Sequence, residues 1–170
     1  MTLAYPAQPI YWRLNLPKRH LVAGVGNVLY GDDGAGIEAL IYLKARLNQK
    51  QFEFLEFSTQ SIDLINYIKK YPVNFIIDAV DFKMPPGFVK AFRLKDVNAD
   101  MDSGKVSSHG IKLLDFLKLC KALKIKNKIY IIGVQPKEIS FRQGLSKEVL
   151  DSFPKILSEI EKLISPYPEN

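Results

Sequence analysis

Three side chains that could bind a metal ion lie where predicted strands and helices meet loops. Asp33 follows an apolar strand and a glycine-rich loop, Asp78 lies near the end of another apolar run, and His109 opens a predicted helix. Two carboxylates and one imidazole suit a borderline divalent metal such as nickel, zinc, iron or cobalt, and they leave coordination positions open for a substrate. Each residue alone is better explained as a cap or a strand end, so the hypothesis depends on all three converging.

The segment around Asp33 has the pattern of a strand, a loop and a helix. Apolar residues 21–23 precede the loop 24–36, which holds five glycines and two adjacent carboxylates. An amphipathic run follows, and its expected buried side chains are Ile37, Leu40, Ile41, Leu43 and Leu47. Open α/β sheets bind ligands where loops leave the carboxyl ends of their strands, so we expect a site at this junction.

Strands alternate with helices along the rest of the chain. We expect strands over residues 20–26, 52–57, 73–79, 88–94 and 128–134. We expect helices over residues 34–48 and 62–70, from 107–110 onward, and from 146 to about 164. This order predicts an α/β fold: a single three-layer domain with a mostly parallel, twisted five-stranded sheet, helices on both faces and one antiparallel strand. The antiparallel strand, 88–94, should form a hairpin with 73–79, and Pro154 should kink the last helix.

The position of the third strand bears directly on the site. In doubly wound sheets this strand commonly lies beside the first, which brings Asp33 and Asp78 to one edge. Asp32 and Asp81 are then candidates for orienting a ligand or balancing its charge. Asn27 is a candidate for holding the loop through bonds from its side chain to the backbone.

The first nineteen residues differ from the rest. They contain three prolines, so no helix runs through them. Ile10, Trp12, Leu14 and Leu16 alternate with polar or partly polar residues, which predicts an extended segment with one buried face. We therefore expect an N-terminal extended arm over 1–19 and one domain over 20–170.

Composition restricts the function classes. The net charge is +6, but the lysines are scattered along helices with acids between them, which disfavours nucleic acid as a partner. No apolar run reaches the length of a membrane span, and the N-terminus lacks a signal-peptide pattern. Cys120 is the one cysteine, which fits a reducing compartment. We expect a cytoplasmic, monomeric protein that binds neither nucleic acid nor membrane.

Two other chemistries fit the sequence less well. Nucleotide binding would use Gly24 and Gly26, yet Leu29 replaces the third glycine of the dinucleotide pattern, and carboxylates at a helix N-terminus repel phosphate. A nucleophilic triad has little support, because the Gly-x-Ser-x-Gly pattern is absent and Cys120 falls in the middle of a predicted helix. His20 lies at the start of a predicted strand.

Four ordered motifs together resemble the hydrogenase maturation endopeptidases, from about residue 20 to residue 164. The motifs are Gly24-Val25-Gly26-Asn27-Val28-Leu29-Tyr30-Gly31-Asp32-Asp33-Gly34-Ala35-Gly36, Asp78-Ala79-Val80-Asp81 with Pro86-Gly87, Ser107-Ser108-His109-Gly110 and Gly133-Val134-Gln135-Pro136. Lys83 departs from the pattern, because many relatives carry a glycine soon after the second acid of the Asp-Ala motif. On this resemblance, residues 20–170 form a hydrogenase maturation protease domain.

The resemblance implies a peptidase that removes a C-terminal extension from the large-subunit precursor of a nickel–iron hydrogenase after nickel insertion. The family's metal-contacting and catalytic positions fall on Asp33, Asp78 and His109. The precursor would supply the nickel, and we expect zinc or another divalent ion to substitute in vitro. Nickel either polarises the scissile carbonyl or a bound water, or it serves as a recognition handle while a carboxylate activates water. A non-catalytic checkpoint module that binds the precursor is the alternative, with a nucleotide-binding domain less favoured.

Overall fold

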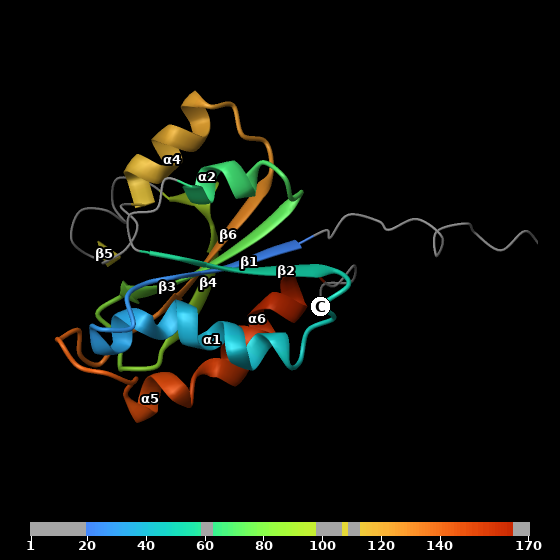
Figure 1. Ribbon diagram of the computed structural model, residues 1–170. Helices are drawn as coiled ribbons and strands as arrows, with labels where there is room; N and C mark the ends of the chain where they lie inside the picture. Colours follow the sequence, from blue (N-terminus) through green and yellow to red (C-terminus); the bar gives the residue numbers. More distant parts are fainter. Residues whose placement is uncertain (1–19, 59–62, 98–106, 109–112, 165–170) are drawn as a thin grey trace, which may run out of the picture.

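A computed structural model describes residues 20–58, 63–97, 107–108 and 113–164 (Figure 1). The predicted arm over 1–19, including its alternating apolar residues, lies outside the described part of the chain. His109 lies outside it as well.

Five main strands form the predicted sheet. They are β1 (His20–Val25), β2 (Phe52–Phe57), β3 (Val73–Asp81), β4 (Val89–Arg93) and β6 (Lys128–Val134). Their order is β2-β1-β3-β6-β4, in which the first four are parallel and β4 runs antiparallel to β6. A two-residue strand, β5 (Ser107–Ser108), pairs antiparallel with the end of β3. The predicted fold class is confirmed, including the third strand beside the first.

The expected hairpin between the third and fourth strands is wrong. β4 pairs with β6 instead, from Val89 opposite Val134 to Arg93 opposite Tyr130. The reason is that β1 and β6 pair with the two edges of β3 over residues 73–77, so no edge of this part of β3 is left for β4. The turn after β3 therefore crosses the end of β6, where the Gln135 N–H donates to the Phe88 carbonyl at 2.8 Å.

Helices cover both faces of the sheet. One face is covered by α1 (Ala35–Lys44), α5 (Lys147–Leu150) and α6 (Phe153–Ile164), and the other by α2 (Asp63–Ile68) and α4 (Leu113–Ala122) (Figure 1). Successive strand residues point to opposite faces, so Phe75 and Ile77 pack in the α1 and α6 layer while Ile76 packs in the α2 and α4 layer. Within the described residues, no helix is long and apolar enough to cross a bilayer.

Two expectations about the helices are corrected. Ile41 was expected to be buried but is 69% exposed, because the buried stripe of α1 is Ala39, Leu40 and Leu43, and Ile41 lies about 100° round from Leu40. The last helix is not one kinked helix. It is divided into α5 and α6, and Pro154 lies in the first turn of α6, where a helix needs no N–H donor.

Candidate active site

Glycines let the first loop fold closely onto the sheet. A Cβ atom on Gly36 would lie 2.2 Å from the Ile77 carbonyl oxygen and 2.4 Å from that of Val25, so α1 starts directly on β1 and β3. Gly26 has φ +150°, and a Cβ there would lie 1.9 Å from the Asp33 carbonyl oxygen. The 3-10 turn η2 (Gly31–Gly34), which contains Asp33, is thereby held against the carboxyl ends of these strands and contacts β3.

Asn27 stabilises this loop in the way the sequence suggested. Its Oδ1 accepts a hydrogen bond from the Leu29 N–H at 3.0 Å, which closes a local turn. Its own N–H donates to the Asp33 carbonyl at 3.3 Å, and the Asp33 N–H donates to the Tyr30 carbonyl at 3.3 Å. The backbone of Asp33 is therefore fixed on both sides.

Asp78 lies further inside the sheet than expected. The sequence placed it near a strand end, but β3 continues to Asp81 and Asp78 pairs with Gly133 of β6. It follows Ile77, which pairs with Gly24, so Asp78 is level with the last residue of β1. By strand alternation its side chain shares the face of Ile76, which α2 and α4 cover.

Buried charge gathers at this edge of the sheet. In the described part of the chain, the buried charged side chains are Asp32, Asp33 and Asp78, with exposed fractions of 0%, 4% and 0%. Burying a carboxylate is costly unless its surroundings compensate for lost water, so three at one edge favour a functional site. The structure brings two of the three predicted ligands onto contacting elements, η2 and β3. The third, His109, lies outside the described residues, and those described do not by themselves supply a three-residue metal group.

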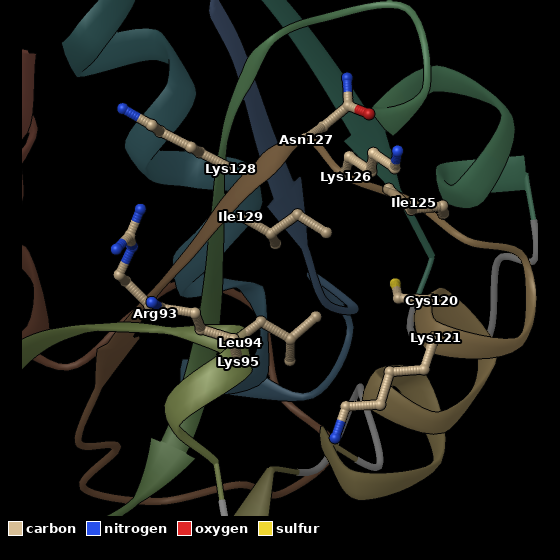
Figure 2. A pocket seen from close by; sticks show the side chains of 10 residues that line it. All are labelled: Arg93, Leu94, Lys95, Cys120, Lys121, Ile125, Lys126, Asn127, Lys128 and Ile129. Atoms are coloured by element: carbon tan, nitrogen blue, oxygen red, sulfur yellow. The ribbon is translucent and has the colours of Figure 1, made fainter.

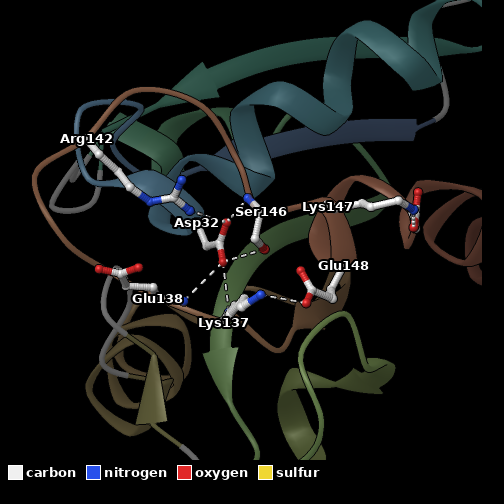
Figure 3. A network of polar contacts seen from close by, with 8 residues as sticks. Asp32, Lys137, Glu138, Arg142, Ser146, Lys147 and Glu148 are labelled. Atoms are coloured by element: carbon white, nitrogen blue, oxygen red, sulfur yellow. Dashed lines mark hydrogen bonds and ion pairs between the residues drawn. The ribbon is translucent and has the colours of Figure 1, made fainter.

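Asp32 is used for a structural purpose (Figure 3). Its Oδ1 accepts the Ser146 N–H at 2.6 Å. Its Oδ2 accepts the Ser146 hydroxyl at 2.8 Å, the Lys137 N–H at 2.8 Å and the Glu138 N–H at 3.2 Å. The Arg142 guanidinium lies 3.6 Å from Oδ1. The carboxylate therefore joins η2 to the 135–146 loop, and its oxygens are committed to that loop.

These contacts also set the charge of Asp32. Desolvation by burial is the largest single influence and acts to raise the pKa, but the bonds from Ser146, Lys137 and Glu138 together outweigh it and lower the pKa of Asp32. Ser146 occupies the N-cap position of α5, yet its side chain bonds to Asp32 and not to the helix.

Asp81 holds the turn after β3. It accepts hydrogen bonds from the Lys83 ammonium, from the Lys83 N–H at 3.0 Å and from Gln135 Nε2 at 3.2 Å. The bond from the Lys83 ammonium is the main reason that the pKa of Asp81 is lowered. Lys83 has φ +57°, the left-handed region that favours glycine, so this lysine adopts a backbone conformation that glycine takes more readily.

Gln135 joins two segments, a role that its residue type alone does not predict. Its Oε1 accepts the Phe82 N–H at 2.7 Å, and its backbone carbonyl accepts the Gly87 N–H at 2.9 Å. Its position in the fourth motif, Gly133-Val134-Gln135-Pro136, is the sequence feature that could have indicated this role. Gln135 thus joins the end of β6 to the turn that follows β3.

Cys120 and His20 lie away from the acidic edge. Cys120 lies within α4, as predicted, and its burial raises the pKa of its thiol to about 11, which disfavours a nucleophilic thiolate. Figure 2 shows its sulfur, with Leu94 and Ile129, beside a cavity of about 220 Å³ near the amino end of β6. His20 begins β1, and the centroid of its ring lies 4.8 Å from that of the Phe52 ring. It is roughly 16 Å from the carboxyl end of β1. Neither residue belongs to the acidic site.

The fold and the buried acids define a doubly wound α/β protein with a carboxylate site at the carboxyl edge of its sheet. The chain belongs to the hydrogenase maturation protease family, whose model matches residues 37–163. Hydrogenase expression/formation protein HupD of Thiocapsa roseopersicina is 33% identical over 121 residues, which cover 70% of this chain and 55% of HupD. HupD of Rhodobacter capsulatus is 30% identical, over 72% of this chain and 60% of its own length. The chain thus spans little more than half the length of these curated relatives.

Solved structures agree in fold. The NiFe hydrogenase maturation protease HybD from Thermococcus kodakarensis has a TM-score of 0.69 and 31% identity, and the match covers 86% of this chain and 99% of that one. The hydrogenase maturating endopeptidase HybD from E. coli has a TM-score of 0.68 at 22% identity, covering 86% of this chain and 91% of HybD, which supports the fold alone.

Proposed function

We propose that this protein is a cytoplasmic endopeptidase that removes the C-terminal extension of a nickel–iron hydrogenase large-subunit precursor after nickel insertion. Family membership and the likeness to the Thermococcus kodakarensis protease support this function. The observation that carries it is the pair of buried carboxylates, Asp33 and Asp78, on contacting elements at the carboxyl edge of the sheet. Ligand-binding sites of open α/β sheets lie at this edge.

In this proposal Asp33, Asp78 and His109 contact the nickel that the precursor carries, so the metal is part of the substrate. Carboxylate oxygens and an imidazole nitrogen are suitable ligands for nickel and zinc. Asp78 is on the sheet face that α4 covers, and α4 begins four residues after His109, which favours their meeting. Asp32 is not a further ligand, because four hydrogen bonds occupy its carboxylate.

Hydrolysis requires water to attack the scissile carbonyl carbon, the C–N bond to break and the leaving nitrogen to gain a proton. Two routes use the same residues. Nickel polarises the carbonyl or lowers the pKa of a bound water, or a carboxylate accepts the proton of water while nickel only holds the precursor. Asp33→Asn and Asp78→Asn distinguish them, because an amide keeps a ligand oxygen but cannot accept the proton. In the second route, one of these variants binds nickel-loaded precursor without cleaving it.

The decisive experiment incubates purified protein with nickel-loaded and with nickel-free precursor and measures the mass lost. We expect cleavage of the nickel-loaded precursor alone, and its loss in Asp33→Ala, Asp78→Ala and His109→Ala. Asp151→Asn is the matched control, since Asp151 is exposed and pairs only with Lys147 in the described residues. Equal cleavage of both precursors would refute nickel recognition. Nickel-dependent binding without cleavage would refute the peptidase and establish the checkpoint module.

A further inference from the structure

Large apolar side chains gather on the two loops beside Asp33. In the described part of the chain, four exposed large apolar side chains lie in the turn 27–30 and the loop 135–146. We call these four side chains the hydrophobic loop surface. They are Val28, Leu29, Tyr30 and Phe141, with exposed fractions of 40%, 47%, 44% and 78%. The other exposed large apolar side chains are scattered over separate elements. Such a cluster is typical of an interaction site, whereas single exposed apolar residues are common.

The hydrophobic loop surface is one unit, although its parts are far apart in the sequence. The Arg142 N–H donates to the Leu29 carbonyl at 3.0 Å, and the Gly31 N–H donates to the Arg142 carbonyl at 2.9 Å. The rings of Tyr30 and Phe141 meet edge to face with centroids 5.9 Å apart. The two loops therefore lie side by side at the carboxyl edge of the sheet (Figure 1).

This surface is continuous with the candidate site. Tyr30 accepts the Asp33 N–H through its carbonyl, and the Asp32 N–H donates to the Glu138 carbonyl at 3.2 Å. The Asp32 carboxylate fixes the 135–146 loop to the same turn (Figure 3). The hydrophobic loop surface therefore lies on the turn that carries Asp33 and on the loop that is hydrogen-bonded to that turn.

We propose that the hydrophobic loop surface binds apolar side chains of the hydrogenase large-subunit precursor next to its cleavage point. The proposal rests on the proposed function and names the surface that positions its protein substrate. Continuity with Asp33 favours the precursor over a second copy of this chain, because only the precursor must reach the acidic site. Aromatic residues such as Tyr30 and Phe141 are typical of the few contacts that carry most binding energy.

The test compares Phe141→Ala and Tyr30→Ala with Ile41→Ala in the full chain. Ile41 is a matched control because it is 69% exposed and lies on α1, outside the hydrophobic loop surface. Cleavage of nickel-loaded precursor gives KM and kcat, and a direct binding assay gives Kd. We expect Phe141→Ala to raise KM and Kd about tenfold and to leave kcat within about twofold, and Ile41→Ala to change neither.

Each outcome decides between the two proposals. If the wild type is active and Phe141→Ala and Tyr30→Ala leave KM and Kd unchanged, the proposed role of the hydrophobic loop surface is overturned and the peptidase proposal stands. A loss of kcat alone would also overturn it, and so would a wild-type dimer that Phe141→Ala dissociates. If the precursor binds in a way that depends on Phe141 but is never cleaved, the proposed peptidase activity is overturned and the binding role of the hydrophobic loop surface is supported. Wild type that neither binds nor cleaves the precursor would overturn both.

Discussion

Replacing Asp32 by alanine should destabilise the protein strongly without touching a proposed ligand. The change removes the acceptor of four hydrogen bonds, two of them from the buried Ser146. It also leaves Arg142, whose guanidinium is 3.6 Å away, without this carboxylate. Disrupting a buried charged network costs about 3–5 kcal/mol, which is a large part of a typical free energy of unfolding. For a chain of this length, Tm should fall by about 6–20 °C.

Urea unfolding monitored by circular dichroism gives the change in the free energy of unfolding. Asp32→Asn should recover little, because its amide group would face N–H donors and only one oxygen would remain. Asp151→Asn, at an exposed ion pair, should change stability by less than about 0.5 kcal/mol. A loss below about 1 kcal/mol in Asp32→Ala would show that Asp32 does not hold the 135–146 loop, and the reasoning would be wrong.

The pH dependence gives a second check on Asp32. Its pKa is lowered in the folded state, so folding favours the ionised form. Its contribution is therefore complete above the unfolded-state pKa of about 3.9, and it is lost as pH falls through the lower folded-state pKa. The stability difference between wild type and Asp32→Ala should be constant near neutral pH and should narrow below about pH 4. A difference that widens on acidification would contradict this sign.

Three further predictions concern the loop, the thiol and the metal. Gly26→Ala should cost more than about 2 kcal/mol and reduce cleavage, because its Cβ would lie 1.9 Å from the Asp33 carbonyl oxygen. Gly144 has φ +79° but open space around it, so Gly144→Ala should lower the free energy of unfolding by only about 1 kcal/mol. If urea unfolding shows equal losses in Gly26→Ala and Gly144→Ala, the clash at Gly26 is disproved. Cys120→Ala should cost about 1 kcal/mol and leave cleavage intact, and inactivity in a folded variant would favour a thiol mechanism. The purified protein should contain little metal and bind nickel and zinc weakly with little preference, whereas stoichiometric nickel after purification would show a resident metal.

The sequence allowed the fold to be predicted where the decisive interactions are local. Alternating strands and helices, and the glycine-rich loop before Asp33, are properties of short segments, and both were confirmed. Pairing of β4 with β6 was missed because it depends on which strand edges other segments have already filled. The buried face of α1 was predicted too broadly at Ile41, since hydrophobicity alone does not define which residues the sheet covers.

The site was only partly predictable for the same reason. Asp32 was identified as a possible orienting group, but its partners lie 105 to 114 residues further along the chain, and its sequence neighbours give no sign of them. Asp78 was found by its position near the end of an apolar run, although the strand continues past it. The separate roles of Asp81 and Gln135 required the three-dimensional turn that joins β3 to β4.

Asp32 and Asp33 are neighbours of one residue type, yet the geometry of their turn gives them different tasks. Both lie in the 3-10 turn η2, in which successive side chains are about 120° apart. The carboxylate of Asp32 points to Ser146 and the loop that precedes α5. Asp33 therefore points in a different direction, and it lies at the buried acidic edge that it shares with Asp78. Shifting the pair by one residue would turn each carboxylate by about 120° round the turn, so the spacing between Gly26 and Gly36 is as necessary to the proposed site as the acids themselves.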